Sequence, residues 1–418
     1  MLNLCILIFQ LTFIKIYKWP EPEFARAVEI TPDSGYLVVG DNQSNILVFK
    51  TDKEGNVLWK KFYGNPNYME YGYHVKRCNS GYIILGGSPN VPYIYILKIN
   101  EDGEIQWEKI YYGGIGFYVD RTFDNGFIIG GIKEYKIYLM KINETGDSLW
   151  SCVYSPESTG LVAYLIKSVE SVGDSGYILS AQGSGACMYG ASCVMRVDLE
   201  GNIIWIINYG WSNSPFPERL DAYIAGAHKT LDNKYITGGI ALPYNLPGQS
   251  PYIWIEKINS DGTHLWGKAY PFAWMKYLET VSDSGFVMVG NKENNVYLIK
   301  FDKNGDLLWE KLYNISSMDT SSYVKETPDK GFIITGYTYN DSTGLDIFLI
   351  KTDSIGYVNI KENKEKGVSL ILNNLNSSLR ENNFYNISGQ KLKFLKKSTP
   401  NIYFILEKNK KSKIVLLK

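Results

Sequence analysis

The chain has 418 residues and a formal net charge of zero, with 45% apolar and 21% charged residues, which is the composition of an ordinary globular protein. Its five cysteines exclude a disulfide-rich scaffold, and its 14% of aromatic residues, with 33 Tyr, favours β structure. The charge is uneven: residues 361–418 carry 12 Lys and one Arg against four Glu, a balance of +9, so residues 1–360 carry −9.

The chain begins with the apolar segment MLNLCILIFQLTF, which is too short to span a membrane. It has neither a basic region nor a small-residue cleavage site. We interpret residues 1–8 as the remnant of a signal segment and expect the folded domain to begin at residue 9. No later segment has the length of a membrane span, so we expect no transmembrane segment.

Two short phrases recur along residues 27–356. The first is TPDSGYLVVG in its first copy, and its seven copies turn at Gly35, Gly81, Gly126, Gly176, Lys234, Gly285 and Gly331. The second is DKEGNVLWKKFY, and its copies turn at Gly55, Gly103, Gly146, Gly201, Gly262, Gly305 and Gly356. Gly accepts positive φ and Asp or Asn hydrogen-bonds a turning backbone, so each phrase reads as a tight hairpin turn.

Each copy therefore contains four short strands, A to D, with tight A–B and C–D turns. In the first copy we expect strands at Ala27–Thr31, Tyr36–Gly40, Ile46–Thr51 and Asn56–Tyr63. Four antiparallel strands repeated every ~40–50 residues are typical of a β-propeller blade. The sequence predicts an all-β fold: a seven-bladed β-propeller over residues 9–358, followed by a small β-sandwich over residues 359–418.

The seventh copy lacks its strand D after Gly356, while FIKIY at Phe13–Tyr17 matches WKKFY at Trp59–Tyr63. We therefore expect the N-terminal strand to complete the last blade and close the ring. The phrase carries one Trp in each of the other copies: Trp59, Trp107, Trp150, Trp205, Trp266 and Trp309. Quinone-dependent dehydrogenase propellers also have a Trp after a Gly turn. A Trp that recurs in every blade favours a packing role between blades. We therefore expect no cofactor.

The insertions fall on the face that carries the B–C and D–A loops, which we call the loop face. Binding residues concentrate on loops of a rigid scaffold, and aromatic loops suit a carbohydrate or protein ligand. The alternative is that these rings only cap the core. The candidate ligand-binding residues are Tyr189, Trp211, Phe216, Tyr244, Tyr252 and Trp274. Cys187 and Cys193 lie close enough in sequence to form a disulfide, and two free thiols are the alternative.

Polar residues recur near the end of strand A, facing the expected central channel. They are Glu29, Lys76, Asp120, Glu170, His228, Glu279 and Lys325. Such a ring can bind an ion or act as acid and base, or it can simply line a solvated channel. No nucleophile triad, phosphate loop or metal-binding motif appears in the sequence, so we expect no catalytic residue and no metal site.

After Ile360 the repeats stop, and the tail reads NNFYNISGQKLKFL and then STPNIYFILEKNKKSKIVLLK. Apolar segments alternate with Lys, which favours a small folded β domain over a basic arm, and we expect no nucleic-acid partner. The tail resembles the C-terminal sorting domain of the bacterial type IX secretion system. The matching residues are Tyr385, Asn386, Gly389, Leu392, Ile402, Tyr403, Phe404, Lys413, Ile414, Val415 and Lys418.

The resemblance implies a small β-sandwich that is read by the secretion machinery, and a location outside the cell or on its outer surface. The propeller repeats resemble those of secreted propellers that precede such domains. We therefore expect a monomeric, secreted, non-catalytic binding scaffold. The alternatives are an extracellular enzyme acting on polysaccharide and a quinone-dependent dehydrogenase.

Overall fold

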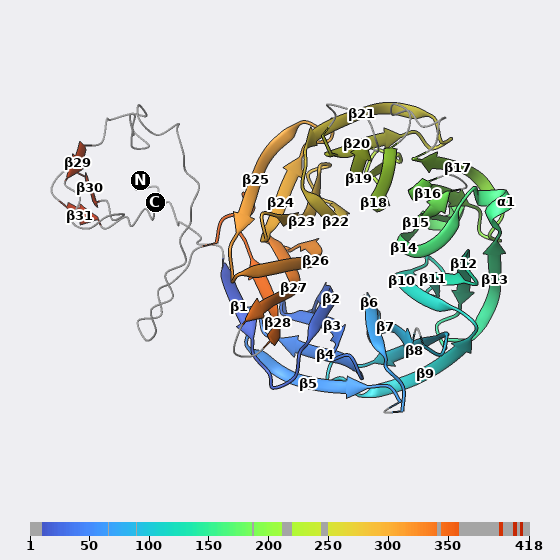
Figure 1. Cartoon of the computed structure of the whole chain (residues 1–418). Coiled ribbons are helices and arrows are strands. Elements are labelled where there is room, and N and C mark those ends of the chain that lie inside the picture. The colour runs from blue at the N-terminus through green and yellow to red at the C-terminus, as the bar shows by residue number, and fades with distance from the viewer. Residues whose placement is uncertain are drawn as a thin grey trace, which may run out of the picture. The chain divides into compact units, whose positions relative to one another are not determined.

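A computed structural model describes the chain from residue 11 to residue 358, except residues 66, 89, 186–187, 211–219, 244–249 and 341–343. In the tail it describes residues 393–395, 404–407 and 410–412. The chain divides into two compact units, residues 1–362 and 363–418. The first unit is a closed ring of seven four-stranded antiparallel sheets around a central channel (Figure 1). This confirms the predicted seven-bladed β-propeller.

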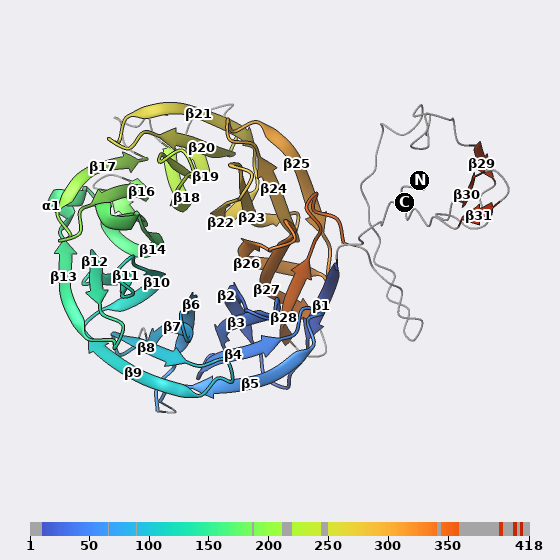
Figure 2. The same ribbon diagram turned by 180° about the vertical axis from the view of Figure 1, so that it is seen from behind.

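The first three blades follow one another in chain order, each with strand A innermost and strand D outermost (Figure 2). Blade 1 contains β2 (Phe24–Ile30), β3 (Tyr36–Asp41), β4 (Ile46–Thr51) and β5 (Val57–Tyr63). Blade 2 contains β6 (Tyr71–Cys78), β7 (Gly81–Ser88), β8 (Tyr93–Ile99) and β9 (Ile105–Tyr112). Blade 3 contains β10 (Ile115–Arg121), β11 (Phe127–Lys133), β12 (Lys136–Ile142) and β13 (Ser148–Tyr154).

The short helix α1 (Pro156–Thr159) leads into blade 4, and the 3₁₀ turn η1 (Gly173–Ser175) forms its A–B turn. Blade 4 contains β14 (Val162–Ser171), β15 (Tyr177–Gly185), β16 (Met188–Val197) and β17 (Ile203–Tyr209). Blade 5 contains β18 (Leu220–Lys229), β19 (Tyr235–Pro243), β20 (Tyr252–Ile258) and β21 (His264–Pro271). Blade 6 contains β22 (Trp274–Thr280), β23 (Phe286–Lys292), β24 (Asn295–Phe301) and β25 (Leu307–Tyr313).

Blade 7 is built from both ends of the propeller. It contains β26 (Met318–Glu326), β27 (Phe332–Asn340), β28 (Gly344–Lys351) and, as its outermost strand, β1 (Phe13–Tyr17). β1 pairs antiparallel with β28, with Phe13 opposite Lys351 and Tyr17 opposite Ile347. The predicted closure of the last blade by the N-terminal strand is confirmed.

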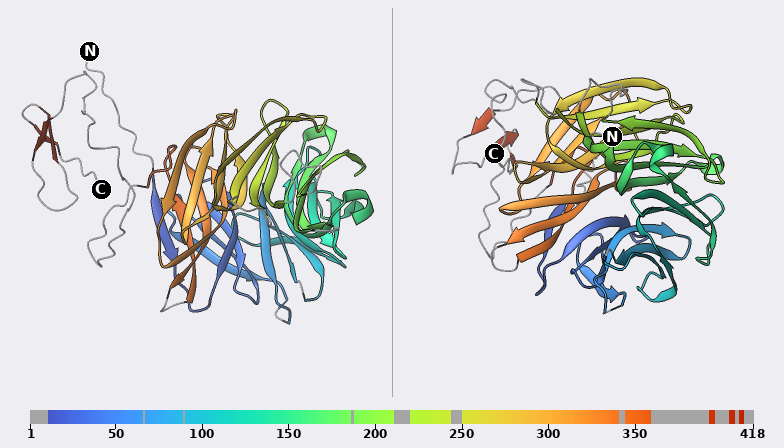
Figure 3. Two further views of the ribbon diagram at one scale, coloured as in Figure 1. Left: turned by 45° about the horizontal axis from the view of Figure 1, so that its top comes forward. Right: turned by 45° about the vertical axis from the view of Figure 1, so that its right-hand side comes forward.

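The core lies between neighbouring blades, because strands B and C are covered on both faces. β3 and β4, for example, are buried along their whole length. A strand covered on both faces reads as a continuous apolar run rather than as an alternating pattern. Figure 3 shows the blades side by side around the ring.

Strand D contacts the next blade through one aromatic pair spaced four residues apart. The Trp ring lies against the glycine of the next C–D turn: a Cβ on Gly103 would lie 2.9 Å from the Trp59 ring. The Tyr that follows donates a hydrogen bond to the carbonyl of the same glycine, and Tyr63 Oη lies 2.6 Å from Gly103 O. The predicted packing role of the Trp series is therefore confirmed.

The same contact closes the ring. A Cβ on Gly55 would lie 2.8 Å from the Phe13 ring, and Tyr17 Oη donates to Gly55 O at 2.8 Å. Phe13 therefore takes the Trp position, as the alignment predicts. The joint between blades 4 and 5 differs, because the ring of Tyr209 stacks on Trp254 and, among the described contacts, its hydroxyl makes no hydrogen bond to the carbonyl of Gly262.

The glycines of the two turns serve different purposes. All seven C–D glycines have positive φ, from 75° at Gly103 to 89° at Gly201, as the sequence predicts. In most A–B turns the positive φ lies one residue earlier, at Ser34 with φ 64° for example. The expectation that the A–B glycine itself supplies this conformation is therefore wrong for most blades. At Gly35 a Cβ would lie 2.1 Å from Thr51 O, so the close approach of strand C requires glycine there.

The tail contains three short strands that pair antiparallel: β29 (Lys393–Leu395), β30 (Phe404–Glu407) and β31 (Lys410–Ser412). The remainder of the predicted β-sandwich lies outside the described residues. So do the sorting-motif residues Tyr385, Gly389, Tyr403, Lys413 and Lys418. Within the described part of the chain, no helix is long and apolar enough to cross a membrane.

Substitution of Phe13 by Ala tests the ring closure. We expect the free energy of unfolding to fall by about 2 kcal/mol, because a half-buried ring is removed from its contact with Gly55. Tyr17→Phe removes the hydrogen bond to Gly55 O and costs about 1 kcal/mol. Urea denaturation followed by Trp fluorescence measures both effects.

Ile16→Ala on the same strand is the matched control, since Ile16 is 37% exposed. A loss of stability at Phe13→Ala no larger than that at Ile16→Ala would show that β1 does not hold the ring closed.

Candidate functional site

The innermost strand of every blade contains a β-bulge at an equivalent residue, which fixes what faces the channel. The pairing register shifts between Ala25 and Ala27 in blade 1, and between Gly72 and His74 in blade 2. The bulged residues are Arg26, Tyr73, Phe117, Lys167, Ala225, Lys276 and Ser322. Because strand A enters from the loop face, these residues form the ring nearest that face, which we call the loop-side ring.

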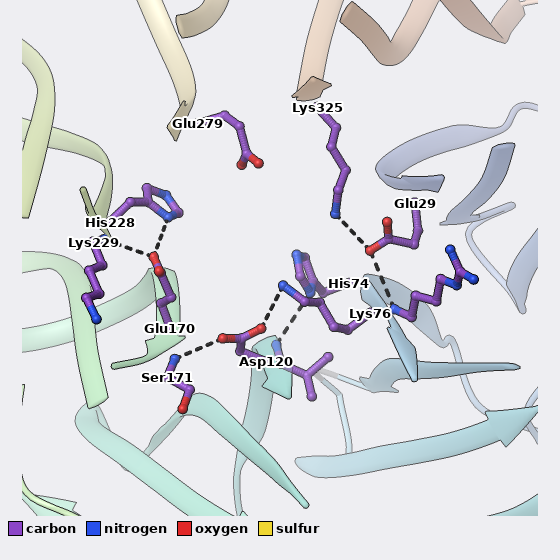
Figure 4. A network of polar contacts seen from close by, with 12 residues as sticks. Glu29, His74, Lys76, Asp120, Glu170, Ser171, His228, Lys229, Glu279 and Lys325 are labelled. Carbon is purple, nitrogen blue, oxygen red and sulfur yellow. Dashed lines mark hydrogen bonds and ion pairs between the residues drawn. The ribbon is translucent and has the colours of Figure 1, made fainter. Parts of the chain in front are cut away.

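Two further rings follow along strand A. The residues directly after the bulges form the middle ring: Ala27, His74, Tyr118, Ser168, Gly226, Tyr277 and Tyr323. Two residues later comes the charged ring, which is the polar series that the sequence predicts: Glu29, Lys76, Asp120, Glu170, His228, Glu279 and Lys325. The charged ring, whose members Figure 4 labels, lies at the end of strand A that leads into the A–B turn.

The charged ring is largely internally paired. Lys325 Nζ lies 2.8 Å from Glu29 Oε2, and Lys76 Nζ lies 2.7 Å from Asp120 Oδ1. Burial opposes ionisation of Glu29, but Lys325 and Lys76 outweigh it and lower the pKa of the carboxyl group. The charged ring therefore does more than line a solvated channel, because its charges form ion pairs between neighbouring blades.

Two carboxylates of this ring also bind the backbone of the next blade. Asp120 accepts the backbone N–H of Ser171 at 2.8 Å, and Glu170 accepts that of Lys229 at 3.1 Å (Figure 4). Hydrogen bonds of this kind connect successive innermost strands. Part of the charged ring therefore has a structural purpose.

His228 and Glu279 are the members of the charged ring whose side chains have groups available for acid–base chemistry. His228 Nδ1 lies 3.1 Å from Glu170 Oε2, while its buried Nε2 has no hydrogen-bond partner. Burial disfavours the imidazolium, but Glu170 outweighs it and raises the pKa of His228. Burial likewise raises the pKa of Glu279, whose Oε2 accepts a hydrogen bond from Tyr277 Oη at 3.1 Å. A histidine oriented by a carboxylate beside a second carboxyl group is an arrangement capable of proton transfer.

Aromatic side chains of the middle ring fill the channel. Tyr277 and Tyr323 stack with ring centroids 4.0 Å apart, and Tyr118 from the far side lies parallel to Tyr277 at 6.3 Å. The His74 ring lies 4.7 Å from Tyr118 and 5.5 Å from Tyr323. This aromatic layer separates the charged ring from the loop-side ring.

A chain of hydrogen bonds runs through this layer. His74 Nδ1 accepts the backbone N–H of Val119 at 3.5 Å, and His74 Nε2 lies 3.2 Å from Tyr323 Oη. The hydroxyls of Tyr323 and Tyr277 are 2.9 Å apart, and Tyr277 Oη contacts Glu279. Tyr277 Oη is thus within donor distance of both Tyr323 Oη and Glu279 Oε2, and it links His74 and Tyr323 to the charged ring. Burial, reinforced by Lys76, keeps the pKa of His74 well below its ordinary value.

The loop-side ring carries cations that are not all compensated. Arg26 Nε lies 2.6 Å from the buried Asp41 Oδ2. Lys167 and Lys276 have no hydrogen bond or ion pair within the described part of the chain. Burial, together with Lys276, lowers the pKa of Lys167 to about 8, and partial desolvation lowers the pKa of Lys276. The sequence analysis missed these two lysines, although both lie three residues before a member of the predicted polar ring.

Most of the predicted aromatic ligand site falls outside what the structure describes. Trp211, Phe216, Tyr244 and the side chain of Tyr189 lie outside the described residues. Of the two that are described, Trp274 is 48% exposed at the start of β22 on the loop face. Tyr252 is half-buried in β20 and packs against the core of blades 4 and 5.

The described loop face carries other exposed aromatic side chains that the sequence analysis did not select. They are Tyr68, Tyr112, Tyr135, Tyr164 and Tyr339. The face with the tight turns carries Phe123 and Tyr357. Exposed aromatic side chains are thus concentrated on the loop face. They lie on strand ends and hairpins as well as on the long loops.

Cys193 is a free thiol, fully buried on β16, and burial raises its pKa to about 12. Its side chain packs into the core of blade 4. Cys187, the proposed disulfide partner, lies outside the described residues, so the disulfide stays a prediction. Among the described residues, no group of three or more His, Cys, Asp or Glu side chains has the arrangement of a metal site.

Fold and channel together place the chain in the structural class of seven-bladed β-propellers. It is similar to virginiamycin B lyase from Staphylococcus aureus, determined as a catalytically inactive variant with quinupristin, with 10% identity and a TM-score of 0.53; the match covers 81% of this chain and 99% of the lyase. It is also similar to the WD40 propeller domain of Doa1, with 10% identity and a TM-score of 0.50 over 80% of this chain and 97% of that domain. No family model and no curated protein sequence matches the chain. At such identity the likeness concerns the fold alone.

The two channel histidines predict a stability maximum near pH 6.5. The raised pKa of His228 adds stability as pH falls from its folded pKa to the unfolded value of about 6.5. The lowered pKa of His74 removes stability as pH falls below about 6.5, since only the unfolded chain then takes up the proton.

Urea denaturation between pH 5 and pH 8 measures this profile. His228→Gln should flatten the limb above pH 6.5, and His74→Gln the limb below it. An unchanged profile in both variants would contradict the assigned protonation states.

Proposed function

We propose that the propeller is a non-catalytic binding scaffold that holds its ligand on the loop face, over the mouth of the channel. The observation that carries this proposal is the contrast between the two sides of the aromatic layer. The charged ring is mostly paired and joined to the backbone of neighbouring blades. The loop side combines exposed rings with two lysines that have no ion pair among the described residues. Groups left uncompensated on one rigid face are available to a ligand.

The alternative of an enzyme rests on His228 and Glu279, which have the chemistry for proton transfer. Both lie on the other side of the aromatic layer from the exposed loop-face rings. His228 is only 8% exposed, and its Nε2 is buried. A substrate on the loop face would therefore have the aromatic layer between itself and this pair, which favours the binding scaffold.

Trp274→Ala tests the location of the ligand site. A screen of the full chain against glycan and protein arrays identifies a ligand, and its affinity is then measured by calorimetry. We expect Trp274→Ala to weaken binding about tenfold, because an exposed ring supplies roughly 1.4 kcal/mol by stacking.

The matched control is Phe123→Ala. Phe123 is 57% exposed in an A–B turn on the opposite face, so its removal should leave the affinity unchanged. Equal effects of the two variants, or an effect at Phe123 alone, would place the ligand away from the loop face.

We further propose that residues 359–418 direct the chain out of the cell to the outer surface through the type IX machinery. The support is the order of the three motifs around Tyr385, Tyr403 and Lys413 near the end of the sequence. The net charge of +9 in residues 361–418, against −9 in the rest of the chain, also sets the tail apart as a separate module.

Truncation after residue 358 tests this proposal in a bacterial host with that machinery. We expect the truncated chain to stay inside the cell, as measured by fractionation and surface labelling, while the full chain reaches the surface. Export of the truncated chain at an undiminished level would exclude a sorting role for the tail.

A further inference from the structure

Two lysines of the loop-side ring, Lys167 in blade 4 and Lys276 in blade 6, have no side-chain hydrogen bond or ion pair within the described part of the chain. Each is the bulged residue of its innermost strand, so each interrupts the strand pairing and faces the channel. The ring member between them, in blade 5, is Ala225. Ala225 is fully buried in the core between blades 5 and 6, so blade 5 places no charged side chain at this ring position between the two lysines.

The described acidic groups on the loop side of the propeller are already engaged. Asp41 pairs with Arg26 at 2.6 Å. Asp319 accepts the backbone N–H of Ile315 at 2.8 Å and the hydroxyl of Thr338 at 2.6 Å, and Asp221 accepts the backbone N–H of Gly190 at 3.1 Å. Within the described part of the chain, none of these carboxylates approaches the two lysines.

A partly desolvated ammonium group without a partner is costly, and among the described residues Lys167 is such a group, with the exposed Lys276 close enough to repel it. Burial and mutual repulsion lower the pKa of Lys167, which is the expected response of a cation with no counter-charge. A bound anion would remove both penalties at once. Structural lysines of this propeller look different: Lys141, in strand C, pairs with Asp124 at 2.9 Å.

Aromatic rings lie on the same two strands, toward the loop face from each lysine. Trp274 is two residues before Lys276, 48% exposed, and its ring lies edge-on to Phe272 at 5.2 Å. Tyr164 is three residues before Lys167 and 50% exposed. Flat rings beside a cation suit a sugar that carries an acidic group, because the ring face packs on the aromatic side chain and the acid pairs with the ammonium group.

We propose that the loop-side ring binds an acidic oligosaccharide, with Lys167 and Lys276 holding its carboxylate and Trp274 and Tyr164 packing against its sugar rings. This inference rests on the proposed binding function and specifies its ligand class. The net charge of −9 over residues 1–360 favours a ligand with one charge per sugar over a dense polyanion such as nucleic acid, which the rest of the surface would repel.

The experiment uses the full chain and a matched pair of probes. One probe is an oligogalacturonate, and the other is its methyl ester, which keeps the sugar rings and removes the charge. Calorimetry should detect binding of the acid form and at least a tenfold weaker binding of the ester. Lys167→Met and Lys276→Met should each weaken binding of the acid form about tenfold.

Lys303→Met is the control, since Lys303 is exposed in a C–D turn on the other face, and it should leave binding unchanged. A second measurement needs no ligand: Lys167→Met should raise the Tm by about 2 °C, because it removes a buried charge that has no partner. An unchanged or lower Tm would show that the ammonium group is compensated in the free protein and would overturn the proposal.

Other outcomes separate this inference from the proposed function. One outcome is that acid and ester bind equally, and that Trp274→Ala weakens binding while the lysine substitutions do not. This outcome would overturn the acidic ligand and would support the proposed loop-face site. Lysine-dependent binding of an acidic peptide or an oligonucleotide, with none of the oligogalacturonate, would overturn the sugar class. Failure of Trp274→Ala to affect any ligand found would overturn both.

Discussion

The propeller depends on one contact, repeated at each joint between blades: an aromatic ring of strand D against the glycine of the next C–D turn. At the closing joint the ring is Phe13 and the glycine is Gly55; elsewhere it is a Trp, as at Trp59 and Gly103. Glycine is needed there twice over, because its φ is positive and because a Cβ would clash with the ring. The following Tyr adds a hydrogen bond to the same glycine carbonyl at six of the seven joints.

This contact lies at the circumference, which leaves the innermost strands free to vary. Strands A share a bulge and a register, so they present equivalent positions to the channel in every blade, yet the residues at those positions differ from blade to blade. The middle ring, for example, has Gly226 in blade 5 and Tyr277 in blade 6. A scaffold whose joints are the same everywhere can carry an asymmetric set of side chains at its centre, and asymmetry is what a specific ligand site requires.

The fold could be predicted from the sequence because its determinants are local: Asp-x-x-Gly turns, a Trp at fixed spacing, and a missing strand that reappears at Phe13. The site could be predicted only in part, because its determinants are not local. The polar ring ending in Lys325 was visible as a series, but its pairing with Glu29 joins residues 296 positions apart in the sequence. The bulges could not be read from the repeats, so the ring that contains Lys167 and Lys276 was missed.

The aromatic layer gives the two halves of the channel different electrostatics. On the turn side, most carboxylates of the charged ring are paired with cations, so a ligand there would compete with pairs such as Lys76 and Asp120. On the loop side, the half-buried Lys167 and the exposed Lys276 have no such pairs among the described residues, and a bound anion gains their attraction without that cost. An anionic ligand should therefore approach from the loop face and stop at the aromatic layer formed by His74, Tyr118, Tyr277 and Tyr323, which makes this layer the floor of the site rather than part of a passage.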